Sequence, residues 1–201
     1  RDSNTTDQSA NASTGCVMIG DSSAVKVTTD PFMFNQLYPV AIGRQSKAGN
    51  GSIGIGPNCG NIDNLYAVNI GASAGSNSPN NTFSVNIGAN SGRDNQGSSS
   101  FALGSFAGYN NQGGGCIGIG NQAGYNYQGQ NAVAIGGESG GQTQGEDAVA
   151  IGSVSGLVAQ GIRSISIGSE AGRNTQGQEA VAIGYWAGQN TCLLYTSPSP
   201  R

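Results

Sequence analysis

The chain has 201 residues, of which 35 are Gly, and it carries 8 Lys and Arg, 11 Asp and Glu, no His, and a formal net charge of −3. The lack of histidine removes the commonest general base and metal ligand, and the scattered cations form no basic patch for a nucleic acid. No apolar run approaches the roughly 20 residues that a membrane-spanning helix needs, so we expect no membrane insertion within this chain.

Composition divides the chain into four parts. Residues 1–15 are polar and are predicted to be a flexible leader. Residues 16–66 are predicted to form irregular coils, with an apolar, Pro-containing excursion at 28–39 that either caps the end of a stack or docks on a neighbour. Residues 67–191 are regular repeats, and residues 192–201 differ in character from everything before them.

The last segment, 192–201, reads CLLYTSPSPR. It resembles the in-frame translation of the adapter used in transposase-based sequencing libraries, because every codon of that adapter stretch fits. We therefore predict a non-native tail that takes no part in the fold.

One tetrad recurs along the chain: a large apolar residue, a variable residue, Ile or Leu, and then Gly. From Gly88 to Gly184 the tetrad returns every 16 residues without a slip. A second glycine follows four residues after the first, and a Gln-Gly pair follows at positions eight and nine, as in Gln144-Gly145. Self-similarity at a fixed short period is typical of solenoids.

The apolar pair is spaced i and i+2, which is strand alternation rather than helix spacing. Glycine directly after the pair permits a tight corner, and stacked coils can bury what one coil cannot. The sequence thus predicts an all-β, single-stranded parallel β-roll (β-solenoid) of about eleven coils. The predicted structural core, with side chains pointing into the roll, is Val133, Ile135, Val149, Ile151, Ile165, Ile167, Val181 and Ile183.

Two further columns carry structural predictions. A small residue four places before the first glycine, as in Ala132 and Ala148, indicates either close approach of a neighbouring roll or a tight roll interior. Cys16 and Cys116 occupy this column and Cys59 the Ala/Ser column after the glycine, as suits small buried thiols. Stacked amides can hydrogen-bond along a rod, so we predict a structural glutamine ladder of Gln96, Gln112, Gln128, Gln144, Gln160 and Gln176.

The units AVAIGGESG, AVAIGSVSG, SISIGSEAG and AVAIGYWAG resemble the head repeats of YadA-type trimeric autotransporter adhesins. Similar arrays occur in fibre proteins of phages and large DNA viruses. The resemblance covers about residues 16–191 and implies a left-handed roll, a homotrimer with three chains side by side, and a location on a cell surface or virion surface outside the cell. It also implies a host-surface protein or glycan as the partner.

Aromatic residues at variable positions are the candidate binding residues. Tyr109 and Tyr125 share a column and could stack on sugars; the full set is Tyr109, Tyr125, Tyr127, Tyr185 and Trp186. The acidic residues Asp94, Glu138, Glu146, Asp147, Glu170 and Glu179 do not all fall in a single column, which argues against a calcium roll or paired catalytic carboxylates. We therefore expect no catalytic residue, no cofactor and no metal site, and a glycan hydrolase is disfavoured.

The sequence favours a structural or adhesive surface protein, the head or shaft of a trimeric adhesin or of a fibre. The alternative is an ice-binding β-solenoid, which would require a flat rank of threonines. The column seven places after the first glycine is mixed, reading Asn95, Asn111, Tyr127, Thr143, Ala159, Thr175 and Thr191.

Overall fold

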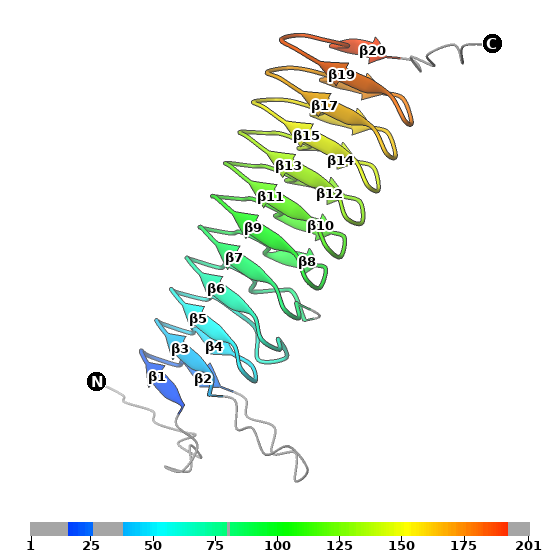
Figure 1. Ribbon diagram of the computed structural model, residues 1–201. Helices are drawn as coiled ribbons and strands as arrows, with labels where there is room; N and C mark the ends of the chain where they lie inside the picture. The colour runs from blue at the N-terminus through cyan, green and yellow to red at the C-terminus, as the bar shows by residue number, and fades with distance from the viewer. Residues whose placement is uncertain (1–15, 26–37, 80, 193–201) are drawn as a thin grey trace, which may run out of the picture.

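A computed structural model describes residues 16–25, 38–79 and 81–192. Within these ranges the regular secondary structure is β-strand with no helix, and the strands pair in parallel. The chain winds through successive coils that rise along one axis from the N-terminal to the C-terminal side (Figure 1). The predicted β-solenoid is confirmed. The predicted leader, most of the apolar excursion, and residues 193–201 of the predicted tail lie outside the described residues. Cys192, the first residue of that predicted tail, is instead the last residue of strand β20 (Asn190–Cys192) and pairs with Gln176.

Each coil contributes a strand to a first, eleven-stranded sheet. Its strands, in spatial order, are β1 (Val17–Ile19), β3 (Val40–Ile42), β5 (Ile53–Ile55), β6 (Val68–Ile70), β7 (Val85–Ile87), β9 (Phe101–Leu103), β11 (Ile117–Ile119), β13 (Val133–Ile135), β15 (Val149–Ile151), β17 (Ile165–Ile167) and β19 (Val181–Ile183).

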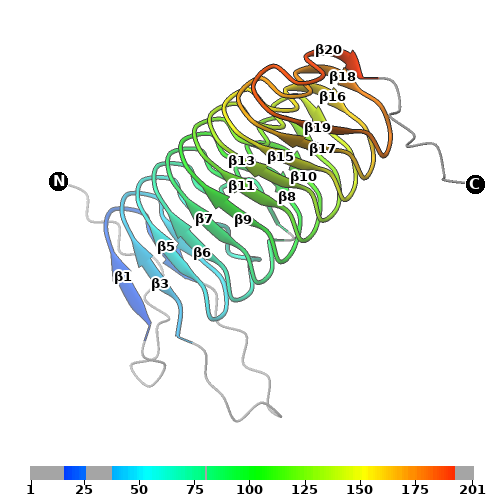
Figure 2. The ribbon, with the colours of Figure 1, turned by 45° about the horizontal axis from the view of Figure 1, so that its top comes forward.

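A second, seven-stranded sheet runs beside the first through the regular coils (Figure 2). Its strands are β8 (Asp94–Gln96), β10 (Asn110–Gln112), β12 (Tyr127–Gln128), β14 (Thr143–Gln144), β16 (Val158–Gln160), β18 (Asn174–Gln176) and β20 (Asn190–Cys192). In the irregular coils, β2 (Ala24–Val25) pairs with β4 (Lys47–Ala48) instead.

The register places like on like. Val133 pairs with Val149 and Ile135 with Ile151. One coil of the solenoid therefore corresponds to one 16-residue repeat of the sequence. Parallel strands spaced in this way satisfy each other's backbone groups along the whole rod.

The inward and outward faces of the first sheet are the reverse of the prediction. In β13 the central Ala134 is fully buried, whereas Val133 and Ile135 on either side are half-buried. The same pattern holds in β15 and β17, and in the last strand Val181 and Ile183 are 48% and 65% exposed. The predicted core of Val133, Ile135, Val149, Ile151, Ile165, Ile167, Val181 and Ile183 is therefore wrong: these side chains point outward.

The physical reason is the thinness of the coil. Two short strands and two tight returns leave an interior that holds one small side chain from the first sheet and one glutamine from the second. Spacing i and i+2 places the apolar pair on one face but does not say which face. The small column before the strand is buried, with Ala132, Ala148 and Ser164 at 0% exposure, so its small size fits the tight interior.

The predicted glutamine column lies inside the roll, where every member is buried, but it forms a ladder only at its N-terminal end. Gln96 Nε2 donates to Gln112 Oε1 at 3.1 Å, and Gln112 Nε2 donates to Gln128 Oε1 at 2.6 Å. From there on the side-chain amide crosses the interior instead. Gln144 Nε2, for example, donates to the backbone carbonyls of Val133 and Ala148.

Gln128, Gln160 and Gln176 make the same pair of bonds to carbonyls eleven residues before and four residues after themselves. From Gln128 to Gln176 the glutamine column therefore ties the second sheet to the first, which Gln96 and Gln112 do not do. A hydrogen bond to a buried group is worth about 1 kcal/mol net and costs more when it is left unmade, so the column is a repeated cross-brace.

The first glycine of each repeat makes the corner after the strand of the first sheet. At Gly136 the φ angle is +127°, and a Cβ there would lie 2.6 Å from the carbonyl oxygen of Gly152 on the next coil. Only glycine fits both the backbone angle and the close stacking of the coils.

Candidate binding surfaces

The outer face of the first sheet is uniformly apolar. Register pairs its residues into two columns that run the length of the sheet, and no member of either column is polar or charged. One column is Val17, Val40, Ile53, Val68, Val85, Phe101, Ile117, Val133, Val149, Ile165 and Val181. The other is Ile19, Ile42, Ile55, Ile70, Ile87, Leu103, Ile119, Ile135, Ile151, Ile167 and Ile183.

This face is large and continuous. Monomeric soluble proteins rarely expose apolar patches beyond a few hundred Å², and larger ones mark interaction sites. Polar residues such as Gln130 and Asn131 lie exposed in the turns that lead into the strands. An apolar centre with a polar margin is the arrangement of a protein–protein interface.

The outer face of the second sheet has the opposite character. Its exposed column carries side chains of mixed polarity: Asn95, Asn111, Tyr127, Thr143, Ala159 and Thr175. Asn95 Nδ2 donates to Asn111 Oδ1 at 3.2 Å, so the first two amides are tied together. The rod therefore has one apolar side and one polar side.

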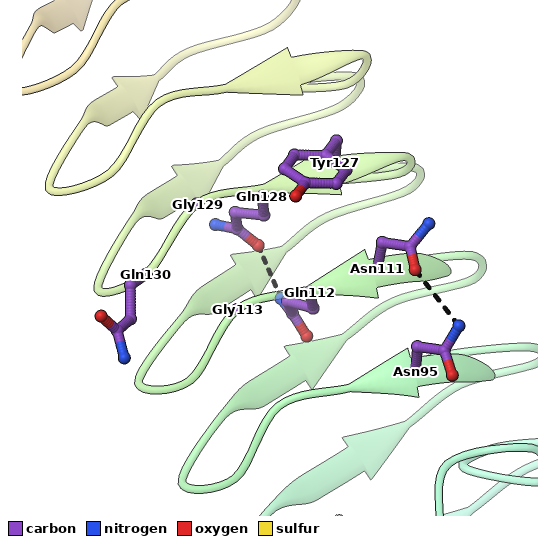
Figure 3. A pocket seen from close by; sticks show the side chains of 8 residues that line it. All are labelled: Asn95, Asn111, Gln112, Gly113, Tyr127, Gln128, Gly129 and Gln130. Atoms are coloured by element: carbon purple, nitrogen blue, oxygen red, sulfur yellow. Dashed lines mark hydrogen bonds between the residues drawn. The ribbon is translucent and has the colours of Figure 1, made fainter.

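A shallow hollow of about 260 Å³ lies on the polar side, across β8, β10 and β12 (Figure 3). It is lined by Asn95, Asn111, Gln112, Gly113, Tyr127, Gln128, Gly129 and Gln130. None of these residues is charged. The ring of Tyr127 stands at one side and is 58% exposed, and the side chain of Gln130 extends toward the coil below (Figure 3).

Tyr109 and Tyr125, two of the predicted binding residues, are engaged with protein neighbours. Their rings stack at a centroid distance of 5.0 Å and an interplanar angle of 5°, and Phe106 packs tilted against both. On its other side Tyr109 meets Arg93, whose guanidinium lies 5.6 Å from the ring centroid and whose Nη1 donates to the tyrosine hydroxyl at 2.9 Å. Both faces of the Tyr109 ring are thus occupied by Tyr125 and Arg93. These contacts indicate that Tyr109 and Tyr125 stabilise the corner between successive coils.

Tyr185 and Trp186 stack on each other in the coil of β19, with ring centroids 4.6 Å apart, and both are exposed. A hydrogen bond from Trp186, then bonds from Gln189 and Arg173, lower the pKa of the Glu170 carboxyl below its usual range. This pair presents open ring surface, as does Tyr127. Of the five predicted binding residues, only Tyr127 lines the hollow.

The buried thiols are chemically quiet. Cys59 and Cys116 are free and buried, whereas Cys16 is half-buried. Burial raises the pKa of the Cys116 thiol to about 11 and also raises the pKa of Cys59. A thiol that stays protonated is a poor nucleophile and a poor metal ligand.

No group of three or more His, Cys, Asp or Glu side chains that could hold a metal ion occurs among the described residues. In the same part of the chain, no helix is long and apolar enough to span a bilayer.

Comparisons with protein-family models, with curated proteins and with solved structures give no match for this chain.

Sequence reasoning placed Asn95, Asn111 and Tyr127 in one column but did not connect them with Gln130. Position ten of the repeat carries Ser98, Gly114, Gln130 and Glu146 in successive coils, so its composition gave no signal that Gln130 would line a hollow.

Proposed function

We propose that the chain is a structural and adhesive rod, the head or shaft of a homotrimeric surface adhesin or of a phage or viral fibre. The observation that carries the proposal is the apolar outer face of the first sheet. Apolar side chains on a long, regular face favour burial at roughly 25 cal/mol per Å². A stable soluble rod therefore covers this face.

A second copy of the chain is the occupant that fits best. The face repeats with the pitch of one coil, and the same face on another copy has the same pitch, so aliphatic side chains can interdigitate along the entire length. A globular partner would match only a few coils. The resemblance to trimeric adhesin heads sets the number of copies at three.

Adhesion follows from geometry rather than catalysis. When the apolar faces meet at the centre of a bundle, the polar outer face of the second sheet points away from the axis on each copy. Each weak contact made by one rod is then repeated on its neighbours, and multivalency raises the overall affinity without a stronger single site. A location outside the cell, on a cell or virion surface, belongs to the same proposal.

The test is the molar mass of the full 201-residue chain in solution, measured by light scattering coupled to size exclusion. The proposal expects three times the chain mass of 20.1 kDa, maintained on dilution to micromolar concentration. A monodisperse, stable monomer at that concentration would contradict it.

A further inference from the structure

The hollow on the second sheet has a chemistry that selects its ligand. Its rim consists of side-chain amides and backbone, and its one aromatic ring is Tyr127. Each amide offers both a donor and an acceptor, which is also what a sugar hydroxyl offers. Because the lining contains no charged group, an ionic ligand finds no electrostatic attraction here to replace its hydration.

The amides leave polar atoms for a ligand. Asn95 Nδ2 is used by Asn111 Oδ1, which fixes the two side chains in place. The Nδ2 group of Asn111 and the amide of Gln130 extend on either side of the hollow (Figure 3). Amides held in position by a neighbouring bond lose less conformational entropy on binding.

Tyr127 supplies an apolar surface beside those amides. It is 58% exposed and makes none of the ring contacts that occupy Tyr109 and Tyr125. An aromatic ring with hydrogen-bonding groups on either side suits a ligand with one apolar face and a polar edge.

Gly114 lies next to Gln130, one of the residues that line the hollow. A Cβ at Gly114 would lie 4.0 Å from Gln130 Nε2 and 3.5 Å from the carbonyl oxygen of Ser98, both ordinary contacts. A side chain could therefore be accommodated at position 114. It would occupy the space beside Gln130, as side chains do at the same position in the adjoining coils.

We propose that this hollow binds one ring of a neutral saccharide, with the apolar face of the sugar on Tyr127 and its hydroxyls on Asn111 and Gln130. The proposal deepens the proposed adhesive function by naming its ligand class. Asn111 and Tyr127 of the hollow lie on the second sheet, away from the apolar face, so this part stays open when copies of the rod associate, whereas Gln130 lies in a turn at the margin of that face. Its volume of about 260 Å³ fits a single ring rather than an extended chain, since pockets for larger ligands begin near 300 Å³.

The test is saturation-transfer NMR on the full chain with glucose, galactose, mannose and N-acetylglucosamine at millimolar concentration, and with sialic acid as the charged comparison. We expect transfer to the ring CH protons of at least one neutral sugar and none to sialic acid. Tyr127→Ala should weaken binding about tenfold, the upper end of what an aromatic contact contributes. Gly114→Gln should also weaken binding, since a side chain at position 114 would lie next to Gln130 Nε2.

Thr143→Ala is the matched control, because Thr143 is the next residue in the same column and lies outside the hollow. It should leave binding unchanged. The proposal is overturned if no neutral sugar receives transfer, if Tyr127→Ala binds as well as the parent chain, or if only sialic acid or unglycosylated peptides bind. Light scattering on the same samples separates the two proposals, since a trimer that binds no sugar refutes this inference alone and a monomer that binds sugar refutes only the assembly.

Discussion

The hydroxyl of Ser166 donates a hydrogen bond to Oε1 of Gln176 inside the roll. Ser166 is the central residue of β17, where β13 and β15 carry alanine. Gln176 is therefore a cross-brace whose amide nitrogen and oxygen are both partnered. The equivalent oxygens of Gln144 and Gln160 are buried without a partner.

This difference predicts a stabilising substitution. Ala150 stands ten residues before Gln160, as Ser166 stands ten before Gln176, so Ala150→Ser should supply the missing donor. We expect the free energy of unfolding to rise by about 1 kcal/mol, measured by urea denaturation at fixed protein concentration. Ala102→Ser is the control, because Gln112 Oε1 already accepts from Gln96. Equal effects of the two substitutions would contradict the explanation.

The corner glycines predict that alanine substitutions at two adjacent glycines differ greatly in their effect on stability. Gly136→Ala forces a side chain into a left-handed φ angle and against the carbonyl of Gly152, so it should cost about 3 kcal/mol or more. Gly137→Ala should cost little, because a Cβ there meets no atom within 4 Å. Thermal unfolding followed by circular dichroism measures both, and a similar midpoint for the two variants would show that coil stacking does not require the glycine.

Replacing Val154, which lies at a strained corner, is predicted to increase the stability of the protein. It has a φ angle of +61°, which is unfavourable for a β-branched residue. Asn90, at the same place in an earlier coil, has a φ angle of +57°, and asparagine tolerates this conformation. Val154→Asn should stabilise the protein by about 1 kcal/mol in urea denaturation. A lower stability would mean that the packing of the valine outweighs its backbone strain.

Cys116 predicts a loss of stability in alkali. Burial raises its folded-state pKa from 9.0 to about 11. As pH rises, the thiol therefore ionises first in the unfolded chain, which stabilises the unfolded state relative to the folded state. The stabilisation is complete below pH 9 and is lost as pH rises toward 11, by about 2–3 kcal/mol. The variant Cys116→Ser has the residue that Ser100 and Ser164 provide in the same column. Its free energy of unfolding should depend less on pH over this window. Identical pH profiles for the two proteins would rule out the thiol as the cause.

The period and the strand type could be predicted from sequence because they depend on spacing alone. Alternation at i and i+2 identified the strands, and the glycine columns identified the corners. The direction of the side chains could not be predicted in the same way. Alternation along the strand allows either Val133 or Ala134 to face the interior, and the choice depends on the width of the interior, which the whole coil determines. Likewise the stacking of Tyr109 between Arg93 and Tyr125 required knowledge of the corner that brings successive coils together.

The hollow illustrates the same limit. Its lining combines residues of the second sheet with the turns that follow two of its strands. Column composition identifies such a lining only once the outward direction of each column is known. Without that direction, the glutamines inside the roll and Gln130 outside it look alike.

Charge placed on either side of the rod tests most directly whether the apolar columns face outward. The double variant Ile135→Lys with Ile151→Lys is compared with Thr143→Lys and Ala159→Lys on the polar side, by light scattering and circular dichroism. If the columns face outward, the first variant keeps its β spectrum but loses assembly, because outward lysines reach water in a monomer, while the second variant remains trimeric. Unfolding of the first variant as a monomer, as expected if the isoleucines were core residues, would contradict this orientation, and so would an unchanged trimer.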